Sequence, residues 1–396
     1  MFISIKKLWH YLCYFFQTRK VWTWPQQSEV LIYDEANSEI LLEYLKPWNP
    51  EIMHVRGEQI NMWVLLKSFF RKGRRPDAYI DCFIEKVRPR LCVTTIDNAI
   101  IFYRISGRHP DIKTLFLQNG SRGYNLDVFE SLDNLDSNAL NIFFVDHMLV
   151  FGHTIGELYS RFIKGNILPI GSLKNNFIPK ESSLQRGVIA FISHWQLPYT
   201  GPGYKKLSYD DLWTNPNNLI IQCLMHYAKE KKKRVVIIPS ANAKGRSDLL
   251  VQEKNYYRKL MGNEPEFLLP SEPYPSYSST DSAEIVVALD STLGYESIGR
   301  GNKTAIFQIR GTLTGWSSWN YGWPAKFPEE GPFWTNKPNP DSFVRILDYL
   351  FEISDEQWKK DVESTNFSSL VEYDPGNTIF KSILEKELRP PPSSAH

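Results

Sequence analysis

Residues Ser282–Gly301, SAEIVVALDSTLGYESIGRG, contain the clearest indication of the fold in this sequence. Its run Ile285–Leu289 is continuously apolar, which is typical of a strand in a parallel sheet that is covered on both faces. Short polar side chains end the run, and a helix is expected to begin around Tyr295. A buried strand, a tight turn and a helix in this order are the unit from which doubly wound α/β domains are built.

The turn between this strand and this helix is predicted to bind an anion. N–H groups at a helix start lack partners within the helix, and the hydroxyls of Ser291 and Thr292 stand beside them. Gly294, after Leu293, leaves room for a close approach of the backbone. Glu296 lies just inside the helix, where its carboxylate can accept hydrogen bonds from hydroxyls of a ribose or sugar. A nucleotide-sugar is therefore expected at this turn.

Length and composition exclude several classes of protein. With 396 residues the chain is too long for one ordinary core, so two domains are expected. A net charge of +2 argues against a general nucleic-acid binder. The 4 cysteines are widely spaced without a CxxC pair, which indicates neither a zinc site nor a disulfide framework and suits a reducing cytoplasm. No run reaches the roughly 18 apolar residues that a membrane span requires.

Residues 1–20 combine basic and apolar side chains. Lys6, Lys7, Arg19 and Lys20 occur there without any acid, and apolar side chains recur near helical spacing. One interpretation is an interfacial helix on an anionic membrane. The other is a first helix that packs on its own domain. A secretory signal is not favoured, because the segment lacks a small-residue cleavage site.

Strand and helix signals alternate in two halves of the chain. The expected strands are Val30–Tyr33, Leu91–Ile96, Thr114–Leu117, Phe143–Phe151, Ile167–Ile170, Gly187–Ser193, Arg234–Ile238, Ala283–Leu289 and Thr304–Ile309. A helix is predicted over Gly57–Arg71. This alternation predicts two doubly wound, Rossmann-like domains that face each other across a cleft. Residues 1–180 form the first, 181–345 form the second, and 346–396 supply closing helices and a tail.

A carboxylate follows the expected strand Leu91–Ile96. Asp97, with Asn98 beside it, would lie at a carboxyl end of the sheet, where ligands of such folds bind. In the catalytic interpretation Asp97 is a base, or a nucleophile toward the anomeric carbon of a sugar. In the structural interpretation it caps the next helix.

Amide and basic side chains follow two further strands of the first half. The candidates for acceptor or sugar binding are Gln118, Asn119, Gly120, Arg122, Ser172, Lys174 and Asn175. Amides and a guanidinium can hold a carboxylate or hydroxyls. The alternatives are an Asn-Gly turn for the first group and an interdomain loop for the second.

Polar side chains also follow the strands of the second half. The remaining candidates for donor or nucleotide binding are Ser193, His194, Ser240, Asn242 and Arg310. His194 is placed for a proton or phosphate role. The loop 239–242 could hold a base or phosphates or only turn the chain, and Arg310 could pair with a ligand anion or form a surface ion pair.

Several motifs are absent from the sequence. Neither GxxxxGK[ST] nor a GxGxxG after a strand occurs, which argues against P-loop and dinucleotide sites. No HExxH occurs and no Cys/His cluster, so a zinc site is not indicated. A strand-end DxD triplet is also missing, which disfavours a metal-dependent glycosyltransferase.

The motif DSTLGYESIGRGNKTAIFQIR at 290–310 resembles the nucleotide site of bacterial surface-carbohydrate biosynthesis proteins. These are similar to GT-B glycosyltransferases that use CMP-activated ulosonic acids, namely Kdo and the sialic-like nonulosonic acids. The other matching pieces are TTIDNA, FLQNGSRGY, ILPIGSLKNNF, FISHW and GWPAKFPEEGPFWTN. One departure is the loop PSAN at 239–242, where many CMP-sugar transferases carry a His-Pro pair.

The resemblance implies a cytoplasmic enzyme, peripheral at the inner membrane face, that transfers a ulosonic acid to an oligosaccharide or glycolipid of lipopolysaccharide, O-antigen or capsule. Ser291, Thr292 and Glu296 would bind the CMP part of the donor, and Asp97 would be the catalytic carboxylate. Neither a cofactor nor a metal is expected, because a donor with one phosphate has no diphosphate to neutralise.

Two rival functions remain open at this point. A nucleotide-sugar epimerase would share the architecture and the donor cleft, and would convert free nucleotide-sugar without an acceptor. A non-catalytic, membrane-associated assembly protein would account for the basic N-terminus and for the cluster of Lys67, Arg71, Lys72, Arg74 and Arg75. Such a protein would not be stabilised by nucleotides.

Overall fold

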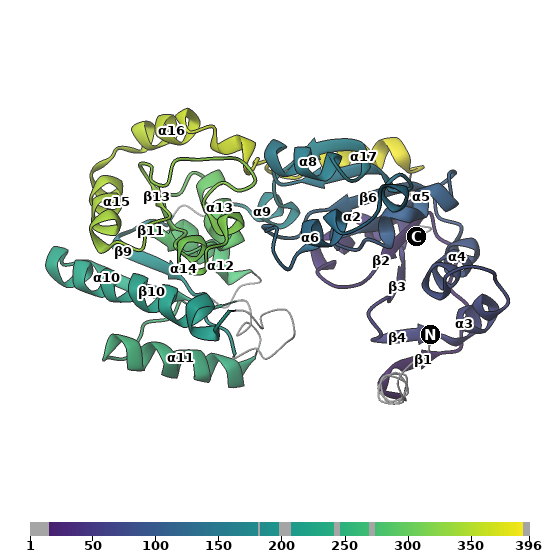
Figure 1. The fold of residues 1–396 in the computed structure, drawn as a ribbon, viewed down its shortest axis with the longest axis horizontal. Helices are drawn as coiled ribbons and strands as arrows, with labels where there is room; N and C mark the ends of the chain where they lie inside the picture. The colour runs from purple at the N-terminus through teal and green to yellow at the C-terminus, as the bar shows by residue number, and fades with distance from the viewer. Residues whose placement is uncertain (1–15, 181–182, 198–206, 241–245, 269–273, 391–396) are drawn as a thin grey trace, which may run out of the picture.

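A computed structural model describes residues 16–180, 183–197, 207–240, 246–268 and 274–390 (Figure 1). Residues 1–15, and with them most of the expected basic N-terminal helix, lie outside the described residues. The chain forms two α/β domains, each built on a parallel sheet with helices packed against it, as the sequence predicts. Among the described residues, no helix combines the length and apolar character needed to cross a membrane.

The N-terminal domain contains a six-stranded sheet in which every neighbouring pair is parallel. In spatial order its strands are β3 (Glu51–Met53), β2 (Val30–Tyr33), β5 (Leu91–Thr94), β6 (Lys113–Leu117), β7 (Phe144–Val150) and β8 (Lys164–Pro169). The strands β2, β5 and β6 are almost fully buried, which explains their continuous apolar runs. The strand order changes direction between β2 and β5, where Val30–Ile32 pairs with Leu91–Val93.

The C-terminal domain contains a five-stranded parallel sheet. In spatial order its strands are β10 (Arg234–Ile238), β9 (Gln185–Ile192), β11 (Ala283–Ala288), β12 (Thr304–Phe307) and β13 (Trp334–Thr335). The strand order changes direction between β9 and β11, where Ile285–Val287 pairs with Ile189–Phe191. Ligands of doubly wound sheets bind outside the carboxyl ends of the strands at such a point. The apolar run that begins at Ile285 therefore forms most of β11, the central strand of the second sheet.

Helices connect the strands of both sheets. Those of the first domain are α2 (Glu39–Leu45), α3 (Met62–Phe69), α4 (Arg75–Val87), α5 (Ile105–Arg108), α6 (Val128–Asp133), α7 (Ser137–Leu140), α8 (His153–Ser160) and α9 (Leu173–Phe177). Those that follow are α10 (Asn215–Lys231), α11 (Ser247–Met261), α12 (Pro275–Ser282), α13 (Thr292–Gly299), α14 (Arg310–Thr314), α15 (Pro340–Glu352), α16 (Asp355–Ser364) and α17 (Thr378–Glu387).

The last helix, α17, returns to the first domain, where Figure 1 shows it beside α8. Phe380, Ile383 and Leu384 are buried in one core with β2 and β5. Glu387 lies 3.0 Å from the imidazole Nε2 of His147 on β7. The chain therefore crosses twice between the domains, which restricts how far they can separate.

The predicted helix over Gly57–Arg71 is wrong at its N-terminal end. Residues Gln59–Asn61 form strand β4, which pairs in parallel with β1 (Arg19–Val21) in a separate two-stranded sheet. The helix α3 begins only at Met62, where the side chain of Asn61 accepts a hydrogen bond from Val64 N at 3.1 Å. The partner strand lies far away in the sequence, so local periodicity did not reveal the pairing.

Candidate functional site

A cavity of about 390 Å³ lies between the two domains, at the carboxyl ends of both sheets. The first domain contributes residues that follow β2, β5, β6 and β8, and the second contributes residues that follow β9, β10 and β11, together with part of α12. The cavity therefore lies at the points where the strand order changes direction in both sheets, between β2 and β5 and between β9 and β11. The predicted site residues that line the cavity are Gln118, Asn119, Ser172, Lys174, Ser193, His194, Ser240, Ser291, Thr292, Leu293 and Glu296.

The start of α13 forms one wall of the cavity. Ser291 precedes the helix with extended backbone, and its side chain makes no capping hydrogen bond. The Ser291 backbone oxygen accepts a hydrogen bond of 2.9 Å from Gly294 N, so among the first-turn N–H groups those of Thr292 and Leu293 have no acceptor from the cap residue. Glu296, one turn further on, is buried and accepts a hydrogen bond of 2.9 Å from the Tyr277 hydroxyl. Helix-start donors and a buried carboxylate line this wall together, which is the arrangement that the sequence predicts.

Gly294 has a different role from the ligand contact that we expected. It does not line the cavity. A Cβ atom at this position would lie 2.5 Å from the Cβ of Ala288 on β11, which is closer than two such atoms can approach. The glycine therefore allows α13 to pack closely on the strand, and this packing carries Ser291 and Glu296 to the cavity.

The loop after β6 contacts α13 across the domain boundary. The Thr292 hydroxyl accepts a hydrogen bond of 2.9 Å from Ser121 N, and Gly120 lies close to the same hydroxyl. Gln118 fixes this loop, since its side chain donates to Gly120 O and accepts from Phe151 N, each at 2.9 Å. Gly120 itself does not line the cavity, contrary to the prediction. The loop therefore fixes the position of the first domain against the start of α13.

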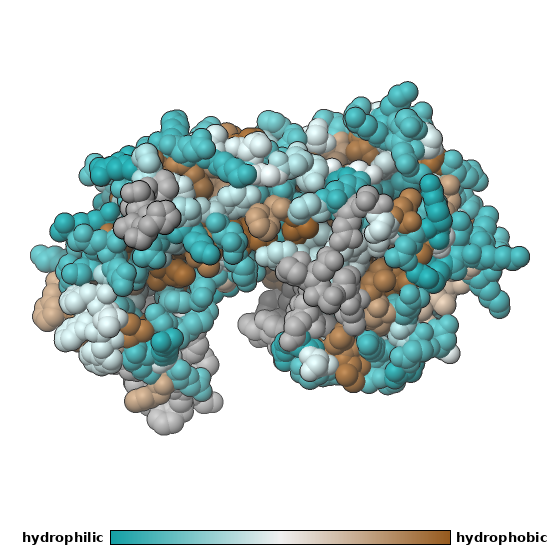
Figure 2. All heavy atoms as spheres, turned by 180° about the vertical axis from the view of Figure 1, so that it is seen from behind, coloured by the Kyte–Doolittle hydropathy of each residue, from teal (hydrophilic) through white to brown (hydrophobic). Residues whose placement is uncertain are grey.

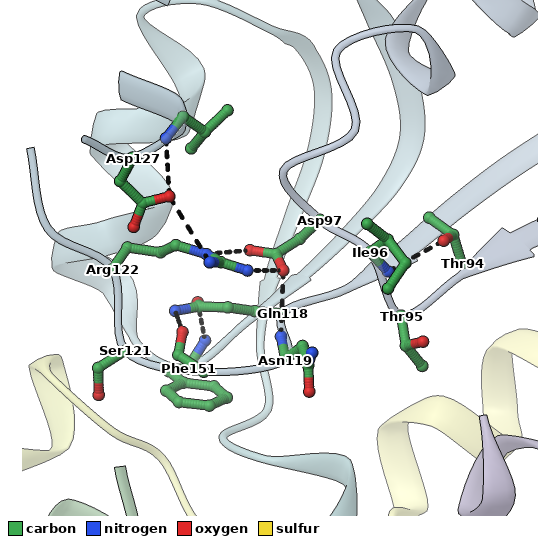
Figure 3. A network of polar contacts seen from close by, with 12 residues as sticks. Thr94, Thr95, Ile96, Asp97, Gln118, Asn119, Ser121, Arg122, Asp127 and Phe151 are labelled. Atoms are coloured by element: carbon green, nitrogen blue, oxygen red, sulfur yellow. Dashed lines mark hydrogen bonds and ion pairs between the residues drawn. The ribbon is translucent and has the colours of Figure 1, made fainter. Parts of the chain in front are cut away.

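Asp97, which we expected to be the catalytic carboxylate, does not line the cavity. Figure 3 shows it in contact with Arg122 and Asn119 of its own domain. Its side chain is 0% exposed. One carboxylate oxygen accepts hydrogen bonds from Arg122 Nε at 2.8 Å and from the Tyr159 hydroxyl at 2.6 Å. The other accepts from Arg122 Nη2 and from Asn119 N. A carboxylate with four donors inside the domain has no room for a substrate, and it holds the β6 loop in place.

Arg122 and Asn98 are also not ligand contacts of this cavity. The Arg122 guanidinium pairs with Asp97 and lies 3.6 Å from Asp127, as Figure 3 shows. Burial alone would lower the pKa of Arg122, but the charge of Asp97 outweighs it and the pKa is raised. Asn98 is exposed and lies outside the cavity lining. Both positions were expected to contact substrate, and neither lines this cavity.

Asn175 does not line the cavity, and it connects the two domains. Its backbone oxygen accepts a hydrogen bond of 3.2 Å from Arg300 Nη1. The Arg300 guanidinium is ion-paired with Asp281, and both side chains are 0% exposed. The Arg300 guanidinium also donates hydrogen bonds to the carbonyl oxygens of Ile178 and Pro179 in the first domain. The buried ion pair therefore connects the end of α13 to the segment after β8.

His194 contacts an ion pair formed by Asp290 and Arg310. Its Nδ1 atom is 3.3 Å from Asp290 Oδ1, and the other oxygen of Asp290 is 2.7 Å from Arg310 Nη1. The Arg310 guanidinium also lies 4.2 Å from the ring centroid of Trp213. Arg310 does not line the cavity, so the predicted donor contact is replaced by a role in holding Asp290. His194 is thereby oriented at the cavity wall.

The pH dependence of stability should report on His194. Burial lowers the pKa of His194 to about 4, although the charge of Asp290 opposes the shift. As pH falls the unfolded chain, with the ordinary pKa of about 6.5, binds the proton first. We therefore expect His194 to remove up to about 3 kcal/mol of unfolding free energy between pH 7 and pH 4. Urea unfolding of wild type and His194→Gln at both pH values measures this, and an equal loss in the two proteins would contradict it.

The two predicted serines of the second domain have partners within it. Ser193 Oγ accepts hydrogen bonds from Trp195 N at 3.1 Å and from the Tyr257 hydroxyl at 2.8 Å. The Ser240 N–H donates to the buried Glu253 carboxylate at 3.0 Å. These bonds shape the strand ends at the cavity wall. Asn242 lies outside the described residues.

Two cavity residues that sequence reasoning missed are Glu39 and Tyr277. Glu39 follows β2 in the first turn of α2, and it is exposed. Its side chain makes no hydrogen bond or ion pair with the described residues. Tyr277 lies on α12 and orients Glu296. The position of Glu39 after a predicted strand was the available signal, but an acid at that place is also common in any first helical turn.

In the described part of the chain, no group of three or more His, Cys, Asp and Glu side chains could hold a metal ion.

Comparison with models of protein families shows to which family the chain belongs. The model of a family described as "putative O-antigen biosynthesis protein" matches residues 115–388, well over half of the sequence. The chain belongs to this family. The match includes the strand–helix unit around Ser291, the β6 loop and α17. A search of curated proteins finds no match. Members of an O-antigen biosynthesis family serve the formation of a surface glycan, in agreement with the coarser part of the predicted function.

Solved structures resemble the chain in fold. UDP-GlcNAc 2-epimerase from Neisseria meningitidis, bound to UDP-GlcNAc, is 12% identical with a TM-score of 0.50, over 90% of this chain and 99% of that one. The epimerase from Methanocaldococcus jannaschii is 10% identical with a TM-score of 0.50, over 89% and 98%. A glycosyltransferase from Rickettsia africae ESF-5 is 10% identical with a TM-score of 0.49, over 93% and 98%. At such identities the likeness to the two epimerases shows the fold alone, which is the predicted GT-B-like arrangement of two doubly wound domains.

Proposed function

We propose that this O-antigen biosynthesis protein is a glycosyltransferase that takes a ulosonic acid, Kdo or a sialic-like nonulosonic acid, from a CMP-activated donor. The observation that carries the proposal is the wall formed by α13. There the N–H groups that begin at Thr292 and the buried carboxylate of Glu296 line one cavity. A phosphate fits the helix start, and ribose hydroxyls fit the carboxylate.

The charge of the cavity supports a donor with one phosphate. Among the described lining residues Lys174 is the single Lys or Arg, while Glu39 and Glu296 are acidic. His194 is neutral at pH 7, because burial lowers its pKa to about 4. A CMP donor carries less phosphate charge than a nucleoside diphosphate sugar, so helix-start N–H groups suffice to stabilise the leaving CMP. The proposed reaction therefore needs no metal and no cofactor.

The opposite wall suits an oligosaccharide or glycolipid acceptor. Asn119, Ser172 and Lys174 line the cavity from the first domain. They supply amide, hydroxyl and ammonium groups that can hold acceptor hydroxyls or phosphates. Glu39 lies on the same side, and we assign it as the general base in place of Asp97. It removes the proton of the acceptor hydroxyl, whose oxygen bonds to the anomeric carbon while the carbon–phosphate oxygen bond breaks and CMP leaves with the electron pair.

A nucleotide screen tests this function. CMP should raise the melting temperature of the protein, since saturation at about 100 times Kd stabilises the native state by about 2.7 kcal/mol. With a CMP-ulosonic donor, free CMP should appear only in the presence of an acceptor glycan. Stabilisation by UDP or GDP alone would contradict the CMP donor. Conversion of nucleotide-sugar without an acceptor would identify an epimerase, and no stabilisation by any nucleotide would support an assembly protein.

A further inference from the structure

The helix α3 carries an apolar stripe that the fold does not cover. Trp63, Leu66 and Phe70, spaced as neighbours on one helix face, are 40%, 41% and 91% exposed. The opposite face carries Val64 and Ser68, which are buried against the domain. The helix is thus packed on one side and leaves large apolar side chains in water on the other, which marks an interaction site.

The stripe continues onto the chain after β1. The Trp63 ring centroid lies 5.7 Å from that of Trp22 and 6.0 Å from that of Trp24. These two side chains are 56% and 42% exposed, and Phe69 beside Phe70 is 55% exposed. We call Trp22, Trp24, Trp63, Leu66, Phe69 and Phe70 the aromatic surface. Ring contacts hold its tryptophans together, so the surface is preformed.

Cations without acidic partners border the aromatic surface. Lys67 and Arg71 of the segment 62–76 pair with Glu85. Lys72, Arg74 and Arg75, which lie two to five residues after Phe70, are exposed and form no ion pair with any described residue. Arg75 lies 5.3 Å from the Phe69 ring, and Lys86 lies 5.0 Å from the Trp24 ring. The segment 62–76 contains no acid. Basic side chains without ion pairs thus adjoin exposed apolar side chains, so the complementary partner is anionic at its surface and apolar beneath.

The aromatic surface lies on a projection of the first domain. Figure 1 shows β1, β4 and α3 extending away from the six-stranded sheet and far from the second domain. On the same flank, seen from behind in Figure 2, pale and brown side chains gather at the edge of the molecule. Nothing in the described part of the chain packs over this flank, so a flat partner can reach it.

We propose that the aromatic surface docks the protein on an anionic lipid bilayer. Tryptophan and phenylalanine side chains enter the headgroup region, and neighbouring lysines and arginines attract anionic headgroups. A second copy of the chain is disfavoured, because a two-fold contact through this surface would place the unpaired cations Lys72, Arg74 and Arg75 of both copies in one interface. The inference does not depend on the donor chemistry of the cavity.

Vesicle flotation with the full chain tests the proposal. The protein should float with vesicles of phosphatidylcholine mixed with phosphatidylglycerol, and high salt should weaken this binding. The variant Leu66→Gln/Phe70→Ser should bind at least about tenfold more weakly. Both side chains are exposed, so its melting temperature should match that of wild type. A matched control is Ile142→Ser, which removes an apolar side chain that is 53% exposed elsewhere in the first domain.

A charge variant completes the test. Lys72→Glu/Arg74→Glu should lose the preference for anionic vesicles, whereas Lys359→Glu/Lys360→Glu on α16 should keep it. Equal binding of wild type to pure phosphatidylcholine vesicles, or wild-type binding by the Leu66/Phe70 variant, would overturn the proposal. A dimer in solution that the Leu66/Phe70 variant abolishes would also overturn it, in favour of a contact between two copies. CMP stabilisation should be unchanged in all variants, so its absence in wild type would count against the cavity alone.

Discussion

Replacing Glu39 with Gln is expected to lower the rate of sugar transfer by about 10²–10⁴-fold, the usual contribution of a general base. Glu39 is the acid among the described first-domain residues that line the cavity, and its side chain makes no hydrogen bond or ion pair with the described residues. Its oxygens are therefore available to an acceptor hydroxyl. The substitution keeps the size of the side chain and removes the proton acceptor, so CMP affinity should change by less than about twofold.

The matched control is Glu43→Gln, one turn further along α2 and outside the cavity lining. That variant removes the same charge from the same helix and should transfer sugar at the wild-type rate. Steady-state measurement of CMP release with saturating donor and acceptor compares the three proteins. Wild-type turnover in the Glu39 variant would remove Glu39 from the mechanism.

Replacing Asp97 with Asn is expected to lower the free energy of unfolding by about 3 kcal/mol. The substitution leaves the Arg122 guanidinium buried without its main counter-charge, and Asp127 at 3.6 Å compensates only in part. Urea unfolding measures the loss. The control Asp111→Asn removes an exposed carboxylate of the same domain and should change stability by no more than about 0.5 kcal/mol.

A double variant separates a structural role of Asp97 from a catalytic one. Asp97→Asn/Arg122→Met removes both charges and should be more stable than Asp97→Asn alone, because no buried charge is left unpaired. Transfer activity should recover together with stability. A stable Asp97→Asn protein that binds CMP but does not transfer sugar would restore the catalytic assignment and contradict the structure-based one.

The sequence predicts the fold well where the burial of a strand shows in its own run of apolar residues. Every strand expected in the two main sheets is present, because fully buried parallel strands require continuous apolar runs such as Ile285–Leu289. Pairings between distant segments were not predictable in this way. The strand β4 at Gln59–Asn61 exists only through its contact with β1, and α17 is placed by apolar contacts with β2.

The site was predictable in part for a related reason. Side chains that follow strands of a parallel sheet gather at one edge, so the α13 start, Glu296 and His194 were found by position alone. Position does not distinguish a carboxylate that faces the cavity from one that faces its own domain. Asp97 is turned inward by Arg122, 25 residues later, while Glu39 faces the cavity. Such pairings depend on tertiary contacts and not on spacing.

The most direct test of the donor site is calorimetric titration of CMP into wild type, Glu296→Gln and Glu356→Gln. Glu356 is an exposed acid on α16, outside the cavity. Wild type and Glu356→Gln should bind CMP with equal affinity. Glu296→Gln should bind about tenfold or more weakly, since it loses hydrogen bonds between ribose hydroxyls and a charged acceptor. No CMP binding by wild type, or unchanged affinity in Glu296→Gln, would contradict the account.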